Sequence, residues 1–177
     1  WTSEQITRGA ALARELNIPL IASQPQYSML WRVIETDIIP TCQREGLGQV
    51  VWSPLAQGIL TGKYQPGKPI PAQSRANSDA GKPFFNKLVQ RWMNDNVLTA
   101  IQKLNPIAQE NHLTLPQLAV AWVLQNPAVS SAIIGASNPQ QIRENVIASN
   151  VTLSPEIMGQ IDSALKGFIE YDPSKTG

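Results

Sequence analysis

The sequence predicts an α/β fold built on a parallel sheet. Three short apolar runs, at residues 20–24, 50–52 and 131–134, have the composition of buried strands. Segments with helical spacing and helix caps separate them along the chain. Because a crossover helix between two strands makes the strands parallel, we expect one parallel sheet with helices packed on it.

The first helix and strand follow from caps and breaks. Thr2 and Gln5 have the spacing of a capping box, which predicts a helix over residues 2–15. Pro19 lies just after that helix, and the apolar run 20–24 then reads as a buried strand.

The second helix and strand lead into a loop. A helix over residues 35–44 is expected to end near Gly46, before the strand 50–52. Because Pro54 cannot continue a central strand, the strand ends just before it. Trp52 is therefore expected at the carboxyl end of the sheet. In α/β sheets ligands bind at that end. The proline- and glycine-rich segment 65–83 predicts a long functional loop.

Three helices are expected next, over residues 84–92, 96–110 and 114–126. The last of them begins with a second capping box, formed by Thr114 and Gln117.

The strand 131–134 leads directly into another helix. Asn138 is a favourable N-cap, Pro139 suits the first helical position, and Gln141 has the spacing to reach back to Asn138. The free N–H groups at such a helix start suit a phosphate, although an ordinary capped helix gives the same pattern. A last helix is expected from residue 154 to about residue 166.

Composition excludes several classes of partner. The net charge of +1 gives no basis for binding nucleic acid, and no apolar run is long enough for membrane insertion. The single Cys42 rules out an internal disulfide and predicts a cytoplasmic protein with a packed thiol. His112, the only histidine, is expected on the surface at a helix end.

Two long motifs carry a resemblance to a known family. One runs from Trp52-Ser53-Pro54-Leu55-Ala56-Gln57-Gly58 through Gly62-Lys63-Tyr64, and the other from Ile134-Gly135-Ala136-Ser137-Asn138 through Glu144-Asn145. In this order and at this separation they resemble the aldo/keto reductase superfamily, in particular bacterial reductases related to potassium-channel β subunits. The resemblance extends from residue 1 to about residue 166.

The resemblance implies a TIM (β/α)8 barrel, of which this chain supplies roughly the last three strands and their helices. A complete barrel needs roughly 200 residues or more, and the chain has 177. In the family, a Trp followed by Thr-Ser-Glu-Gln comes just after the fifth strand. We therefore expect residues 1–177 to be the carboxyl-terminal portion of one barrel domain. Its amino-terminal half, or a second chain, would be the partner of this fragment.

The resemblance also assigns a site for NADP, as NADPH. It implies that Gln24 holds the nicotinamide carboxamide and that Trp52 stacks on the ring, although a loop-bonded Gln and a core Trp fit the residues as well. Lys63 and Arg75 are assigned to phosphates, where surface charges would be the plainer reading. Ser137 and Arg75 are expected at the 2′-phosphate. The full cofactor set is Gln24, Trp52, Ser53, Pro54, Leu55, Ala56, Gln57, Gly58, Lys63, Arg75, Gly135, Ser137, Gln141, Glu144 and Asn145.

The function that the resemblance implies is reduction of a small-molecule aldehyde or ketone by hydride transfer from NADPH. The family's catalytic Tyr and its Asp, Lys and His partners lie on the first four strands, and none is matched here. We therefore expect no catalytic residue in this chain and no turnover by the chain alone. The alternative is an NADP(H)-binding redox-sensing module, as in channel β subunits. Trp31, Phe84, Phe85 and Trp92 are candidates for the substrate side of the site, but we expect them in core packing, and we expect Tyr27 in packing or in a pocket wall.

Overall fold

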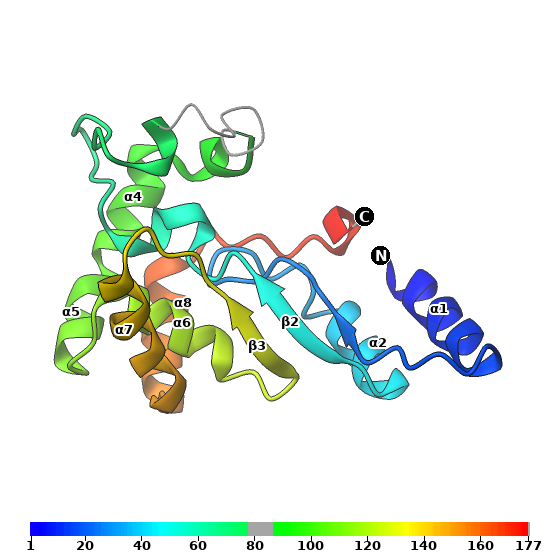
Figure 1. Cartoon of the computed structure of the whole chain (residues 1–177). Helices are drawn as coiled ribbons and strands as arrows, with labels where there is room; N and C mark the ends of the chain where they lie inside the picture. The colour runs from blue at the N-terminus through cyan, green and yellow to red at the C-terminus, as the bar shows by residue number, and fades with distance from the viewer. Residues whose placement is uncertain (78–86, 177) are drawn as a thin grey trace.

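Three parallel strands form a sheet in the order β1–β2–β3. This computed structural model describes residues 1–77 and 87–176. The strands are β1 (Ala22–Ser23), β2 (Gly48–Trp52) and β3 (Val129–Ile133), and Figure 1 shows helices between them along the chain. The predicted α/β class with a parallel sheet is confirmed.

The register brings the carboxyl ends of the strands to one edge. Trp52 at the end of β2 lies opposite Ile133 at the end of β3. On the other side of β2, the Trp52 N–H donates to the Pro25 carbonyl (3.0 Å), and the Trp52 carbonyl accepts from the Tyr27 N–H (3.1 Å). The loops after all three strands therefore begin side by side (Figure 1).

Two of the helices begin with the capping boxes expected from the sequence. Both predicted capping boxes form, with Thr2 and Gln5 at the start of α1 and with Thr114 and Gln117 at the start of α6. The helices are α1 (Ser3–Glu15), α2 (Ile38–Glu45), α4 (Asp95–Gln102), α5 (Leu104–Glu110), α6 (Leu115–Leu124), α7 (Pro139–Val146) and α8 (Pro155–Leu165), with 3₁₀ turns η1 (Ala56–Thr61), η2 (Arg75–Asn77), η3 (Gln90–Trp92), η4 (Ile147–Asn150) and η5 (Pro173–Thr176).

The structure corrects the predicted helix over residues 96–110. This segment forms two helices, α4 and α5, that meet at Lys103. Pro106 explains the break, because it has no N–H to donate to the Gln102 carbonyl and its ring crowds that oxygen.

Other predicted boundaries also shift. The first strand spans two residues rather than five, since Ile21 lies at the sheet edge and is 75% exposed. The helix expected at residues 35–44 begins only at Ile38, and β3 begins two residues earlier than predicted. Residues 84–86 of the helix expected at 84–92 lie outside the described residues, as do Phe84 and Phe85.

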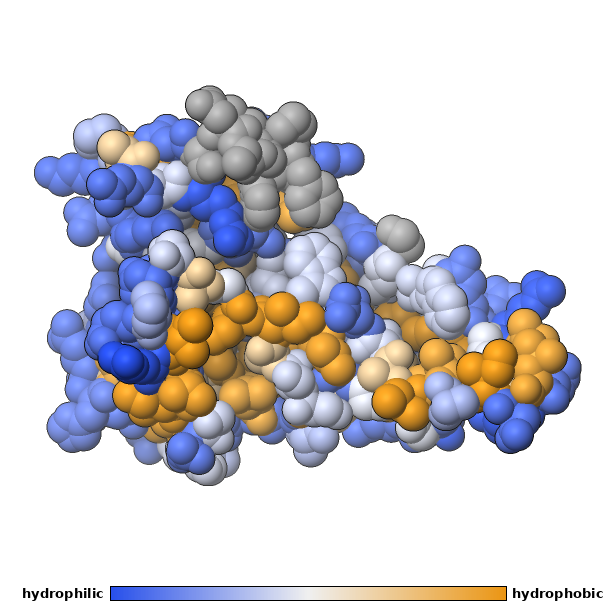
Figure 2. Space-filling view, in the orientation of Figure 1, coloured by the Kyte–Doolittle hydropathy of each residue, from blue (hydrophilic) through white to orange (hydrophobic). Residues whose placement is uncertain are grey.

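The core lies between one face of the sheet and the helices. Val51 and Leu118 are fully buried there, and α2 and α6 lie behind the strands in Figure 1. Because side chains alternate along a strand, Trp52 and its neighbour Ile133 face the other way. Figure 2 shows hydrophobic side chains over the strands on that side, and Ile133 is 42% exposed. One face of the sheet is therefore open.

Candidate functional site

The turn after β2 reverses the chain through unusual backbone angles. Ser53, Ala56 and Gln57 have φ values of 60°, 46° and 59°, in the left-handed region that disfavours residues with a Cβ. Gly58 follows with φ of 100°. Such a cluster of left-handed non-glycine residues is costly and is typical of functional loops.

The Gln57 side chain joins this turn to the loop that carries Arg75. Gln57 Nε2 donates to Ser53 Oγ, and Gln57 Oε1 accepts from Arg75 Nη1 at 2.7 Å. Arg75 also lies against the loop after β3, because a Cβ built at Gly135 would be 3.5 Å from Arg75 Nη2. Segments 18 and more residues apart thus meet at the carboxyl edge of the sheet.

A second cation lies against the same turn. A Cβ built at Gly58 would be only 3.3 Å from Lys63 Nζ, so the absence of a side chain there lets the ammonium approach the backbone. Lys63 Nζ also lies 5.2 Å from the centroid of the Tyr64 ring. The turn therefore carries two cations, an oriented hydroxyl and accessible backbone, which together suit an anionic ligand.

At the start of α7, Asn138 caps the helix as predicted, but the Gln141 side chain bonds elsewhere than predicted. Asn138 Oδ1 accepts from the Gln141 N–H (3.1 Å). The Gln141 side chain reaches past Asn138 to Ser137 and accepts from its N–H (2.8 Å) and its hydroxyl (3.1 Å). The expected capping box is thus displaced by one residue, and the Ser137 hydroxyl can donate to a ligand only by giving up its bond to Gln141.

The remaining predicted residues lie in the turn after β2 and in α7. Pro54, Leu55 and Ala56 form the start of the turn, with Pro54 and Ala56 buried. Glu144 is exposed, and its carbonyl accepts from Gln117 Nε2 (2.8 Å). Asn145 is buried at 8% exposure.

Trp52 is half-buried on the open face of the sheet. Gln24 follows β1 directly and is exposed, and its side chain makes no hydrogen bond to the other described residues. Both residues lie at the carboxyl edge of the sheet, and neither is hydrogen-bonded to Gln57.

Several residues that the sequence analysis set aside from chemistry are packed as expected. Tyr27 is 2% exposed, and its hydroxyl donates to Glu35 Oε1 at 2.7 Å. Burial, the Glu35 charge and this hydrogen bond raise the pKa of Tyr27, and burial raises the pKa of Glu35. Trp31 and Trp92 are buried edge-to-face with centroids 6.3 Å apart.

Two further expectations on single residues are confirmed. Cys42 is a buried free thiol, and His112 is exposed just beyond α5.

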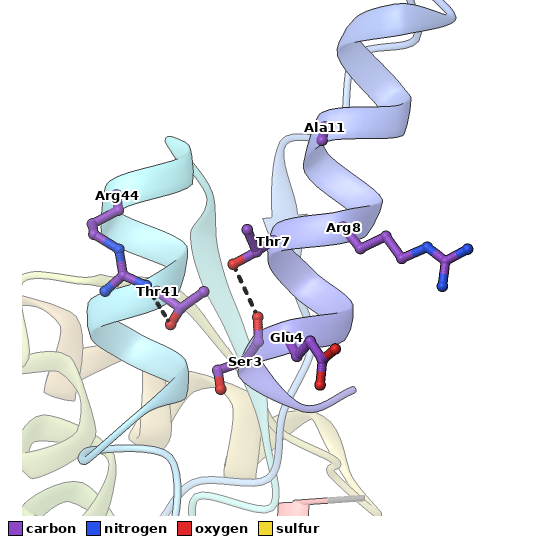
Figure 3. A pocket seen from close by; sticks show the side chains of 7 residues that line it. All are labelled: Ser3, Glu4, Thr7, Arg8, Ala11, Thr41 and Arg44. Carbon is purple, nitrogen blue, oxygen red and sulfur yellow. Dashed lines mark hydrogen bonds between the residues drawn. The ribbon is translucent and has the colours of Figure 1, made fainter.

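An open groove between α1 and α2 lies away from this site (Figure 3). Its polar groups bond mainly within their own helices, since Thr7 Oγ1 donates to the Ser3 carbonyl (3.1 Å) and Arg44 Nη2 donates to Thr41 Oγ1 (3.0 Å). None of the predicted cofactor residues lines it; the lining residues are Ser3, Glu4, Thr7, Arg8, Ala11, Thr41 and Arg44.

Comparison with known sequences identifies the family. Residues 2–166 match the sequence model of the Aldo/keto reductase family. The chain belongs to this family. The resemblance stated from the two motifs is therefore confirmed.

The similar curated proteins fall into two groups. The chain is 40% identical over 171 residues to a protein of Arabidopsis thaliana named as a probable voltage-gated potassium channel subunit beta, covering 94% of this chain and 50% of that protein. A putative voltage-gated potassium channel subunit beta of Schizosaccharomyces pombe is 41% identical over 172 residues, covering 93% and 48%.

The other group carries an enzyme name. L-glyceraldehyde 3-phosphate reductase of Escherichia coli K12 is 36% identical over 164 residues, covering 92% of this chain and 46% of that protein. The chain therefore spans about half the length of the curated relatives it matches. Within the described part of the chain, no helix has the length and apolar character needed to span a membrane.

Proposed function

We propose that this chain is the cofactor-binding half of an NADPH-dependent aldo/keto reductase, in which it contributes roughly the last three strands of a (β/α)8 barrel. The observation that carries the proposal is the chain of contacts from Ser53 through Gln57 to Arg75, which abuts Gly135. It draws the two motif-bearing loops together at the ligand end of a parallel sheet.

The donors at this edge fit a dinucleotide with several phosphates. Lys63 and Arg75 supply positive charge, and the close approach of Lys63 Nζ to Gly58 places that charge beside exposed backbone. Trp52 is half-buried at the end of β2, and its indole is of the kind that stacks on a flat heterocycle. We assign the phosphates to Lys63 and Arg75, with Arg75 and Ser137 at the 2′-phosphate.

The remaining assignments follow the same order along the cofactor. Gln24 is assigned to the nicotinamide carboxamide, the 53–58 turn to the pyrophosphate, and Gly135, Gln141, Glu144 and Asn145 to the adenosine end. NADPH, when bound, supplies the hydride that reduces a small aldehyde or ketone, which a relative named for glyceraldehyde 3-phosphate reduction favours.

Proton donation is assigned to the other half of the barrel. Tyr27 and Tyr64 are each 2% exposed, and the Tyr171 ring lies 5.9 Å from the Arg32 guanidinium carbon, away from the Gln57 contacts. The open face and the free edges of the sheet favour association with an amino-terminal half or a second chain, since three strands cannot close a barrel. A cytoplasmic location is part of the same proposal and rests on the unpaired, buried Cys42.

The test compares residues 1–177 with the polypeptide encoded by the complete gene. NADPH binding is measured by quenching of Trp fluorescence, and turnover by loss of NADPH absorbance with glyceraldehyde and other small aldehydes. We expect saturable NADPH binding and turnover for the complete polypeptide, and no turnover for residues 1–177. Absence of NADPH binding by the complete polypeptide would refute the proposal.

The alternative is a redox-sensing module that holds NADP(H) and acts on a partner protein. It is favoured by the relatives named as potassium channel subunits. Tight retention of NADP(H) with very slow turnover on every aldehyde tried would support this reading, and rapid multiple turnovers would support the enzyme.

A further inference from the structure

Gln57 occupies a position that is unfavourable for its backbone and fully used by its side chain. Its φ of 59° lies in the left-handed region, which costs a residue with a Cβ roughly 1–2 kcal/mol. The side chain is 9% exposed, and both ends of its amide are hydrogen-bonded. The question is what these two bonds do.

The chemistry of Arg75 fixes the direction of the hydrogen bonds from Arg75 through Gln57 to Ser53. A guanidinium has only donors, so the atom of Gln57 that faces Arg75 must be the carbonyl Oε1. The amide nitrogen Nε2 then faces Ser53 and donates to Oγ. The Ser53 hydroxyl therefore accepts at this bond, and its own proton cannot point toward Gln57.

The proton of Ser53 is consequently available for a ligand. A hydroxyl has one proton, and no other described residue accepts it. A phosphate oxygen is an acceptor only, and a hydroxyl that presents its proton outward is the matching donor. With the opposite amide orientation, Gln57 Oε1 would capture the Ser53 proton and the site would lose a donor.

We propose that Gln57 is a positioning residue. Because Arg75 can only donate, it holds the Gln57 amide with Nε2 toward Ser53, and the Ser53 hydroxyl then points its own proton at a cofactor phosphate. This inference rests on the proposed NADPH site. Arg75 fixes which way the Gln57 amide faces, and Gln57 then acts on the cofactor through Ser53, with no contact of its own.

The test is a double-mutant cycle on NADPH affinity with Ser53→Ala and Gln57→Met in the polypeptide encoded by the complete gene. Ser53→Ala is expected to raise the Kd of NADPH about tenfold, as for loss of one hydrogen bond to a charged group. Gln57→Met should raise it about threefold, because the Ser53 hydroxyl keeps its proton and loses only its orientation. Because Gln57 acts through Ser53, the double variant should bind as Ser53→Ala does. Independent roles would instead multiply to about thirtyfold.

Gln125→Met is the matched control. The Gln125 amide is also fully used, donating to the Ala121 and Val151 carbonyls (2.8 and 3.1 Å) and accepting from the Leu153 N–H (3.1 Å), but it lies away from the site. It should lower the melting temperature and leave the Kd unchanged. A Kd change equal to that of Gln57→Met would mean that Gln57 only supports the fold, and would overturn the inference.

Gln57→Glu provides the same test if Gln57→Met does not fold. A carboxylate keeps the volume and pairs with Arg75, so the melting temperature should be at or above that of the wild type. It has no proton to donate, and the Ser53 hydroxyl must donate to it. NADPH binding should weaken at least tenfold, and adding Ser53→Ala should weaken it no further. Multiplying effects would overturn the inference, whereas a wild type that binds no NADPH would overturn the proposed function instead.

Discussion

Replacing Arg75 by Gln gives the most direct measure of the charge at the proposed phosphate site. Arg75 is exposed, its Nη1 donates to Gln57 Oε1 at 2.7 Å, and its Nη2 lies against Gly135. A unit charge 4 Å away contributes about 1 kcal/mol in a water-like dielectric and about 4 kcal/mol at a partly shielded surface. Because Arg75 is exposed, we take the lower part of this energy range, about 1–2 kcal/mol. Arg75→Gln should therefore raise the Kd of NADPH roughly five- to thirtyfold.

The assay is titration with NADPH and with NADH, followed by Trp fluorescence at low and high salt. Arg75→Gln should weaken NADPH more than NADH, because only NADPH has the 2′-phosphate, and the difference should shrink as salt screens the charge. Lys68→Gln is the control: it removes the same charge from an exposed position in the same loop. Equal losses in the two variants would refute the reasoning, and equal losses for the two cofactors would refute the 2′-phosphate assignment.

Three other outcomes are expected. Trp52→Ala should raise the Kd of NADPH about fivefold, from the loss of about 1 kcal/mol of stacking, and Trp52→Phe should restore most of it; no change in Trp52→Ala would exclude stacking. Gln49 is fully buried, and neither of its amide atoms has a hydrogen-bond partner in the described part of the chain, so Gln49→Leu should raise the free energy of unfolding in urea by about 1–3 kcal/mol; a decrease would mean that water satisfies the amide. Burial raises the folded pKa of Glu35 above 4.5, so the wild type should lose stability relative to Glu35→Gln as pH rises from 4.5 through that pKa; a difference independent of pH would refute this.

Local chemistry explains which parts of the fold could be predicted from sequence. Capping boxes depend on residues three positions apart, so the boxes of Thr2 with Gln5 and of Thr114 with Gln117 could be predicted from sequence, and both form in the structure. Pro106 was equally local, and the break that it causes between α4 and α5 was missed although its signal was present. The length of β1 was not readable, because it depends on whether the edge of the sheet is covered.

The candidate site was readable only in part. A strand followed by a proline and a glycine indicated the ligand end of the sheet. Within the 53–58 turn, however, Gly58 was the only residue whose type predicts a positive φ. The left-handed angles of Ser53, Ala56 and Gln57 depend on contacts with the rest of the chain. The bond from Gln57 to Arg75 joins residues 18 positions apart, so no local pattern could predict it.

The polar groups in the described residues suit binding of a cofactor and do not suit proton transfer to a substrate. The hydroxyl, amide and cations of Ser53, Gln57, Lys63 and Arg75 gather at the carboxyl edge of the sheet. The Tyr64 hydroxyl, by contrast, is buried without a hydrogen-bond partner among the described residues, and a phenol enclosed in the core does not reach a substrate to donate a proton to it. Under the proposed function, affinity for NADPH depends mainly on this chain and the proton-transfer step on the other half. Substitutions of Ser53, Lys63 and Arg75, at the proposed phosphate site, should therefore change the Kd of NADPH much more than the rate of turnover at saturating cofactor.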